Sequence, residues 1–223
     1  MLDIKHVKVY DLKETVIASR NAMRIEMPEY TEEEFQESLK RAIQLSKCGG
    51  GSGHTSFRKG IRVSFDMRYT QYITKQFQRY HWLDFVSSSS LMHRITKMDF
   101  DKCCAKYVTQ RNVDDMNDMV KSYNLISESE YVDMIFNLRD GSSIHSTNKK
   151  DCLYYQFMTI IQNCPMGTDL FVRVSTNYEQ IATICKQRRG HKLREDYEEF
   201  FKFARALPYA KELIPEAFYG DEL

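Results

Sequence analysis

Three short segments of this sequence alternate apolar and polar residues, and they lie far apart in the chain. They are residues 4–10 (IKHVKVY), 58–68 (RKGIRVSFDMR) and 169–175 (DLFVRVS). Such alternation predicts strands that bury one face, whereas most of the remaining sequence has helical spacing. Few strands make a small sheet, which many helices must then cover. We therefore predict one α+β domain over residues 1–223, with helices packed on a small central sheet of mixed or antiparallel strands.

Caps and breakers place the helices around these strands. Helical spacing runs over 12–25, Pro28 breaks the chain, and Thr31 begins a second helix over 32–47 with Glu34 at the capping-box position. Residues 83–89 (LDFVSSS) are predicted to be an extended segment that follows the helix over residues 69–82. Further helices are predicted over residues 69–82, 177–189 and 194–207.

The middle of the chain, residues 98–163, is predicted to be mostly helical. The polar segment 141–148 (GSSIHSTN) is predicted to be a mobile loop between two of its helices. The individual helices are predicted over residues 101–110, 112–125, 128–140 and 149–164.

Composition limits the classes of partner. The 223 residues include 32 basic and 31 acidic side chains, a formal charge of +1. This balance argues against a general nucleic-acid coat and leaves room for a local phosphate site, so we expect no direct nucleic-acid partner. No apolar run reaches the roughly 20 residues that a membrane helix needs, so no membrane partner is expected.

The cysteines and the N-terminus indicate the compartment. None of the six cysteines forms a Cys-x-x-Cys pair, which argues against a structural zinc site, and no metal ligand is assigned. The start of the chain reads as a charged strand, not as a signal peptide. We expect a soluble cytoplasmic protein with free thiols.

Three segments could carry chemistry. The glycine-rich segment 48–56 has His54 where a phosphate-binding loop of the Walker type has lysine, so a turn after a helix is favoured. Residues 81–90 (HWLDFVSSSS) combine His81, Asp84 and four serines but lack the Gly-x-Ser-x-Gly elbow of many hydrolases. The basic stretch 186–194 is either a helix end that complements the dipole or a phosphate clamp. Residue types alone leave the function open.

The order of the motifs resembles that of the flavin-dependent thymidylate synthases. These enzymes have Gly-His-x-Ser, a strand, and a helix ending in Gln-x-x-Arg-His-Arg, with a serine after seven more residues. This chain has Gly53-His54-Thr55-Ser56, a predicted strand, and Gln76-x-x-Arg79-Tyr80-His81, with seven residues between His81 and Ser89.

The resemblance continues downstream and covers nearly the whole chain, with a weak middle. Pro165, a strand, Asn177 and Arg188 follow in the family's order, and residues 219–223 resemble the family's aromatic-Gly-Asp-x-Leu ending. The chain resembles a divergent, phage-type member, because several expected residues are replaced. The replacements are Lys59, Gly60, Tyr80, His81, Ser87, Leu91, Phe171 and Glu179.

The replacements remove cationic groups from the expected phosphate site. Because a hydrogen bond to a charged group contributes about 1.5–3 kcal/mol, their loss weakens phosphate binding unless other residues compensate. Arg94 and Arg173 are the candidates for such compensation.

The resemblance implies an FAD-dependent enzyme that transfers a one-carbon unit from methylenetetrahydrofolate to C5 of dUMP, with NADPH as reductant, in a homotetramer. The implied catalytic residues are Ser89 and Arg79. The implied cofactor-binding residues are His54, Ser56, Arg79, His81 and Asn177. The implied residues for the pyrimidine deoxynucleotide are Gln76, Ser89, Arg94 and Arg188. Two alternatives stay open: a changed product or pyrimidine nucleotide, such as hydroxymethylation, and a non-catalytic descendant that binds nucleotide or assembles.

Overall fold

The computed structural model describes residues 2–49 and 52–219, and within it the chain forms two compact units. Unit 1 consists of Met1–Tyr69, Ile73–Ser88 and Phe171–Leu223, and unit 2 consists of Thr70–Tyr72 and Ser89–Leu170. The expectation of a single domain over residues 1–223 stays a prediction. In the described ranges, no helix has both the length and the apolar character needed to cross a membrane.

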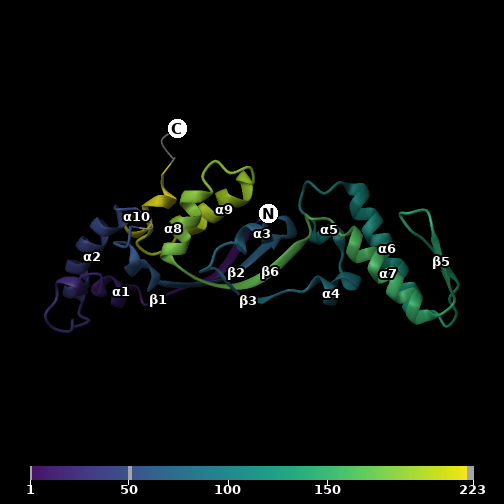
Figure 1. The fold of residues 1–223 in the computed structure, drawn as a ribbon, viewed down its shortest axis with the longest axis horizontal. Coiled ribbons are helices and arrows are strands. Elements are labelled where there is room, and N and C mark those ends of the chain that lie inside the picture. The colour runs from purple at the N-terminus through teal and green to yellow at the C-terminus, as the bar shows by residue number, and fades with distance from the viewer. Residues whose placement is uncertain (1, 50–51, 220–223) are drawn as a thin grey trace. The chain divides into compact units, whose positions relative to one another are not determined.

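A four-stranded sheet organises unit 1 (Figure 1), in the order β1-β2-β6-β3. Its strands are β1 (Asp3–Tyr10), β2 (Arg62–Thr70), β6 (Asp169–Asn177) and β3 (Asp84–Ser88). β1 is antiparallel to β2, and β3 is antiparallel to β6. All three alternating segments contribute a strand, and segment 83–89 supplies the fourth, so the predicted small sheet and the α+β class are confirmed.

Alternation along β2 builds the core of unit 1. Val63, Phe65 and Met67 are buried on one face of the strand. The ring of Phe65 packs 4.7 Å from that of Phe203 in α9 (Arg194–Arg205). Figure 1 shows α9 beside α8 (Tyr178–Gln187) along the sheet. These two helices confirm the predictions for 177–189 and 194–207.

The N-terminal helices of unit 1 are shorter than the pattern predicts, apart from the second. The helix expected over 12–25 ends early as α1 (Leu12–Ala18) and is followed by the 3-10 turn η1 (Asn21–Met23). Thr31 caps α2 (Glu32–Ser46) as predicted, with its Oγ1 accepting from the Glu34 N–H at 3.2 Å. The Glu34 carboxylate pairs with Arg20 and Arg24 instead of completing a capping box. The ion pairs of Arg20 and Arg24 with Glu34 therefore fix the path of the chain after α1.

Two other boundaries move for local reasons. The 3-10 helix η2 (Ser56–Lys59) precedes β2, so the strand begins at Arg62 and not at residue 58. The helix predicted over 69–82 is only α3 (Gln71–Phe77), because Tyr69 and Thr70 complete β2 and a turn follows Phe77. Unit 1 ends with α10 (Ala210–Leu213) and the 3-10 helix η4 (Pro215–Ala217).

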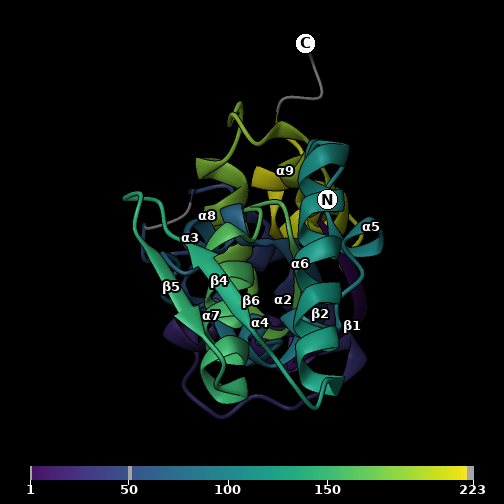
Figure 2. The ribbon, with the colours of Figure 1, turned by 90° about the vertical axis from the view of Figure 1, so that its right-hand side faces the viewer.

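Unit 2 is built on two long helices that run side by side (Figure 2), α6 (Gln110–Glu128) and α7 (Lys149–Asn163). Val113, Met116 and Val120 of α6 share a buried cluster with Ile160 of α7. The short elements α4 (Leu91–Arg94), η3 (Ile95–Lys97) and α5 (Phe100–Cys103) precede α6. Of the helix predicted over 101–110, only residues 101–103 lie in α5, and Gln110 begins α6.

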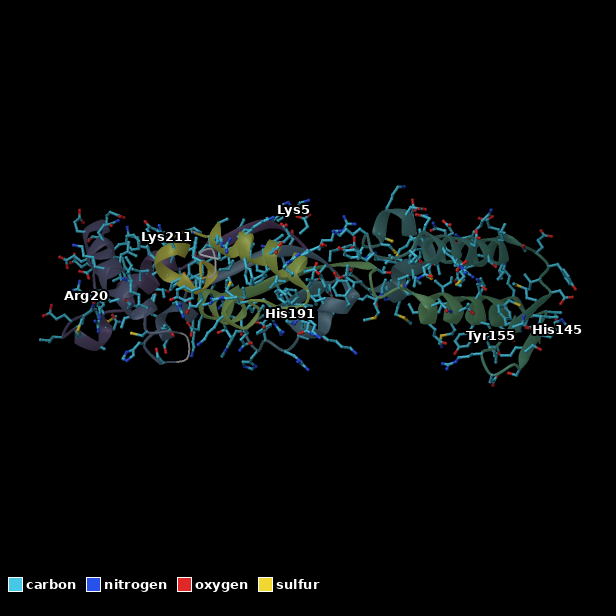
Figure 3. The ribbon with its side chains drawn as sticks, turned by 90° about the horizontal axis from the view of Figure 1, so that it is seen from above. Lys5, Arg20, His145, Tyr155, His191 and Lys211 are labelled. Carbon is cyan, nitrogen blue, oxygen red and sulfur yellow. The ribbon has the colours of Figure 1, made fainter. Side chains whose placement is uncertain are left out.

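The prediction of a helix over 128–140 and a mobile loop over 141–148 is wrong. These residues form an antiparallel hairpin of β4 (Met134–Asn137) and β5 (Ser143–Ser146). Phe136 pairs with Ile144 across the hairpin, and its ring lies 5.5 Å from that of Tyr155 on α7, which Figure 3 labels. Burial of Phe136 against α7 therefore overrides the weak helical spacing of the segment.

Candidate functional site

A pocket of about 490 Å³ opens in unit 1 between the turn that precedes β3 and the polar side of α8. Its size is within the range of small-ligand sites. Its lining residues are Arg79, Tyr80, His81, Gln180, Thr183, Gln187 and Arg188. We call it the arginine pocket.

The first turn of α8 holds the wall of the arginine pocket in place. Asn177 caps the helix, with its Oδ1 accepting from the Gln180 N–H at 2.9 Å. The Gln180 Oε1 in turn accepts from the Trp82 N–H at 3.2 Å, and the Thr176 hydroxyl donates to the Trp82 carbonyl at 2.7 Å. The backbone after His81 is therefore tied through its donor to α8 and through its acceptor to the end of β6.

Arg188 is the most constrained cation of the pocket. Its Nε donates to the Tyr80 hydroxyl at 2.6 Å, and its guanidinium carbon lies 5.3 Å from the Tyr80 ring centre and 5.5 Å from that of Tyr197. Within the described part of the chain, the two terminal amino groups of Arg188 have no hydrogen-bond partner. Two buried tyrosines thus hold a guanidinium whose outer donors remain available.

The surroundings of Arg188 also shift nearby titrations. Burial raises the pKa of Tyr80, and the hydrogen bond and charge of Arg188 oppose this rise. His191, labelled in Figure 3, has its ring edge-on to Tyr197 at 4.9 Å, and burial followed by the charges of Arg188 and Lys192 lowers its pKa. Both pKa shifts favour the uncharged forms of Tyr80 and His191, so Arg188 supplies positive charge among neutral rings.

The basic stretch 186–194 serves as a helix end and contributes one cation, Arg188, to the pocket. Gly190 has a φ of 64°, which suits glycine after a helix and supports the helix-end interpretation. Arg188 lines the pocket, whereas Arg189 donates to the Glu216 carbonyl at 3.4 Å and Arg194 pairs with Glu198. The phosphate-clamp hypothesis thus depends on Arg188 within this stretch.

A second pocket of about 690 Å³ lies between α1, α2 and the glycine-rich segment, also within unit 1. His54 and Ser56 line it together with Arg41, Met23 and Phe57. The Ser56 hydroxyl donates to the Gly53 carbonyl at 2.6 Å, which fixes the turn below the pocket. Gly49, with a φ of 80°, follows α2 as the favoured turn interpretation requires, and Gly50 and Gly51 lie outside the described residues. We call it the histidine pocket.

A buried ion-pair network joins the glycine-rich segment to α8. Arg58 is fully buried, and its Nε donates to Glu179 Oε2 at 2.6 Å while its Nη1 donates to Glu216 Oε2 at 3.0 Å. The Thr55 hydroxyl donates to Glu179 Oε1 at 2.9 Å. Glu179, which stands where the resemblance expects arginine, is therefore the buried acceptor that links Thr55 and Arg58 to the helix.

The structure brings some of the predicted site residues together and separates others. Arg79, His81 and Arg188 share the arginine pocket, and His54 and Ser56 share the histidine pocket. Asn177 lines a third, smaller recess of about 180 Å³ with Trp82. The remaining predicted residues are Gln76 in α3, Ser89 directly after β3, and Arg94 at the end of α4. Ser89 and Arg94 belong to unit 2, so their roles stay predictions.

Arg173, one of the two candidates for replacing a lost cation, is engaged within the sheet. Its Nη1 donates to Asp66 Oδ1 at 3.0 Å and to the His6 carbonyl at 3.2 Å. The His6 ring lies 2.6 Å from the second Asp66 oxygen, and the pKa of Asp66 is lowered first by His6 and then by Arg173. Arg173 thus neutralises a carboxylate of β2.

Four lining residues of the arginine pocket were not predicted as site residues. In the sequence, Tyr80 stands out only as a departure from the family's pattern. Gln180, Thr183 and Gln187 recur at positions i, i+3 and i+7 of α8, a spacing that places them on one face of a helix. That polar face, directly before Arg188, was the signal in the sequence.

Comparison with solved structures identifies the fold of this chain. No family model and no curated protein matches the sequence, but solved structures match almost its full length. A flavin-dependent thymidylate synthase, ThyX from Helicobacter pylori, complexed with FAD and dUMP, has a TM-score of 0.63 at 11% identity over 97% of this chain and 98% of that one. The chain has the flavin-dependent thymidylate synthase fold.

Two further structures agree with this assignment. A second structure of Helicobacter pylori ThyX with FAD and dUMP has a TM-score of 0.62 at 11% identity, covering 98% of this chain and 99% of that chain. The UMP/dUMP methylase PolB from Streptomyces cacaoi, bound with 5-Br dUMP, has a TM-score of 0.53 at 12% identity, covering 96% and 94%. The resemblance inferred from the motifs is thus confirmed at the level of this fold. The tail motif is not tested, because residues 220–223 lie outside the described residues.

Proposed function

We propose that the protein binds dUMP in the arginine pocket and transfers a one-carbon unit to its C5 atom, using FAD and methylenetetrahydrofolate. The observation that carries this proposal is the state of Arg188, whose guanidinium is held by Tyr80 while its terminal amino groups remain available. The flavin-dependent thymidylate synthase fold supports the proposal independently, through solved structures that contain FAD and dUMP.

The arginine pocket suits a nucleoside monophosphate by its chemistry. Two forked donors on one guanidinium match two oxygens of a phosphate. The amide of Gln187 can donate to or accept from the edge of a pyrimidine, and the Nε2 of Gln180, whose Oε1 already accepts from the Trp82 N–H, can donate to it. Gln76 is proposed as a further nucleotide ligand, and the roles that the resemblance implies for Ser89 and Arg94 of unit 2 stay predictions.

The histidine pocket suits an aromatic cofactor. It combines the apolar side chains of Met23 and Phe57 with the polar groups of His54, Ser56 and Arg41. Apolar walls with a few polar groups are typical of cofactor sites. We propose that His54 and Ser56, with Arg79, His81 and Asn177, hold FAD. Bound flavin would carry the one-carbon unit and the reducing equivalents that NADPH supplies, while the protein orients the reactants.

The proposed assembly is a homotetramer acting in the cytoplasm. Both statements rest on the resemblance of the motifs to the family. Sedimentation of the purified protein tests the first directly.

A second candidate keeps the same scaffold and changes the product or the pyrimidine nucleotide. The observation that favours it is the replacement of expected site residues by groups with their own partners. Glu179 is bonded to Arg58 and Thr55, and Tyr80 is bonded to Arg188. A site rebuilt in this way suits a substrate whose edge differs from that of dUMP.

The test begins with the visible spectrum of the purified protein, with added FAD and then with added dUMP. We expect a flavin band that dUMP perturbs, and release of tritium from C5-labelled dUMP in the presence of methylenetetrahydrofolate and NADPH. Product mass then separates methylation from hydroxymethylation. A protein that binds neither FAD nor dUMP would overturn the proposal and leave a non-catalytic role.

A matched pair of variants tests the site itself. Arg188→Gln removes the cation in the pocket, whereas Lys186→Gln removes an exposed cation of the same helix two residues earlier. We expect the first variant to weaken dUMP binding about tenfold or more and the second to leave it unchanged, because a charged hydrogen bond contributes about 1.5–3 kcal/mol. Equal losses in both variants would indicate a general charge effect instead.

A further inference from the structure

We propose that Tyr80 is a positioning residue that orients Arg188 toward the phosphate of the bound nucleotide. The inference rests on the proposed function, since it assumes that the arginine pocket binds a phosphate. It assigns a role to the residue that departs from the family's pattern in the motif Gln76-x-x-Arg79-Tyr80-His81.

The geometry around Nε carries the first step. The Nε–H of Arg188 donates to the Tyr80 hydroxyl at 2.6 Å, a short and therefore strong contact. A guanidinium is planar, so fixing the Nε–H direction within this plane also fixes where the two terminal amino groups point. The hydroxyl thus selects one in-plane direction of the arginine head.

The tyrosine rings carry the second step. The guanidinium carbon lies 5.3 Å from the Tyr80 ring centre and 5.5 Å from the Tyr197 ring centre, within the range of cation–π contact. Tyr80 and Tyr197 are themselves buried. Ring contacts together with one directed hydrogen bond restrict the rotamers of a side chain that would otherwise be mobile, so less entropy is lost when a ligand binds.

The position of Tyr80 in the chain carries the third step. Tyr80 lies between Arg79 and His81, and all three line the pocket with Arg188. The turn that contains them is held through Trp82 to the start of α8 and to the end of β6, and Arg188 follows the last residue of α8. The tyrosine hydroxyl therefore connects the two sides of the pocket at the cation.

This arrangement predicts an effect that depends on the phosphate. Loss of the Tyr80 hydroxyl should weaken binding of dUMP and leave binding of deoxyuridine, which has no phosphate, unchanged. A merely structural role would weaken both ligands equally. The comparison of the two ligands therefore separates positioning from general damage to the pocket.

The experiment measures dissociation constants of both ligands by calorimetry for the wild type and for Tyr80→Phe, which keeps the ring. We expect an affinity for dUMP about five- to tenfold lower in the variant, as the loss of one hydrogen bond implies. The matched control is Tyr178→Phe, which removes the buried hydroxyl that donates to the Pro208 carbonyl at 2.7 Å elsewhere in unit 1. We expect the control to lower thermal stability without changing either affinity.

A double-mutant cycle with Arg188→Gln decides whether Tyr80 acts through Arg188. We expect Tyr80→Phe to have no further effect on dUMP binding once Arg188 is replaced. The inference is overturned if Tyr80→Phe weakens both ligands alike, changes neither, or keeps its full effect without Arg188. If wild-type protein binds neither dUMP nor deoxyuridine, the proposed function fails first, and that outcome is distinct from the others.

Discussion

The guanidinium of Arg58 and the carboxylate of Glu179 meet at 2.6 Å in the interior of unit 1, although 121 residues separate them in sequence. Glu216 adds a second carboxylate to the same guanidinium, and Thr55 adds a hydroxyl to Glu179. The network stands between the segment that lines the histidine pocket and the helix that lines the arginine pocket. Its integrity therefore affects both pockets without either pocket containing Arg58.

Replacing Arg58 by Met should lower the free energy of unfolding by about 3–5 kcal/mol, because two buried carboxylates then lose their cation. Urea unfolding measures the change. The control is Lys59→Met, an exposed cation of the same 3-10 helix, for which we expect less than about 0.5 kcal/mol. Equal effects of the two substitutions would mean that the ion pairs contribute no more than a surface charge does.

Tyr197→Phe should stabilise the protein by about 1 kcal/mol at neutral pH. The Tyr197 hydroxyl is buried and has no hydrogen-bond partner among the described residues, so its removal relieves a desolvation penalty. Denaturant unfolding at pH 7 tests this result. A destabilised variant would reveal a partner for the hydroxyl, such as a buried water.

The same substitution should flatten the alkaline limb of the stability curve. Burial raises the pKa of Tyr197 to about 12, against an ordinary value of 10.0. The folded state therefore keeps the phenol proton longer than the unfolded state, and the associated stability is complete below pH 10 and lost progressively up to about pH 12. The free energy of unfolding, measured between pH 9 and pH 12, should fall less steeply with rising pH in Tyr197→Phe, which lacks this group. Parallel curves for the two proteins would contradict the prediction.

Thr31→Ala should destabilise the protein by about 1 kcal/mol, since the Thr31 hydroxyl is the acceptor that caps α2. Thr31→Ser keeps the hydroxyl and is the matched variant, with an expected change of a few tenths of a kcal/mol. Thermal unfolding of the three proteins provides the comparison. If Ser and Ala behave alike, the methyl group and not the cap is responsible.

Gly141→Ala should destabilise the hairpin of unit 2 by about 1–2 kcal/mol. Gly141 has a φ of 86°, which other residues adopt only with strain, whereas open space surrounds the position where a Cβ would lie. The substitution therefore changes the strain of the backbone at residue 141 without creating a steric clash. Gly141→Asn, which tolerates left-handed conformations better, should lose less. Hydrogen exchange of the amides in β4 and β5 reports the local effect, and an unaltered exchange rate in Gly141→Ala would count against it.

The fold was predictable wherever a local pattern matched its surroundings. The alternation around Phe65 and the hydroxyl of Thr31 each specified an element that the structure confirms. The helical spacing in 128–140 conceals the hairpin, although Asp140-Gly141 is a strong turn signal. Asp140 accepts from the Ser142 N–H at 2.9 Å, as such a turn favours.

The site was predictable only in part. The order and spacing of the motifs along the chain indicate Arg79, His81 and Arg188, and these three residues share one pocket. The role of Tyr80 depends on a side chain 108 residues away, and that of Arg58 on carboxylates 121 and 158 residues away. No local pattern encodes such pairings, since they arise only when distant segments pack together.

The buried position of Arg58 has a consequence for the order of events during synthesis. Unit 1 takes its segments from both sides of unit 2 in the sequence, and Arg58 needs Glu216 from the later side. While the ribosome is still translating the α6–α7 region, Arg58 therefore has neither carboxylate available and must stay hydrated. Residues 89–170 can meanwhile form their helices and hairpin from contiguous sequence. Unit 2 is thus free to fold co-translationally, whereas the pockets of unit 1 must mature after Glu216 has emerged.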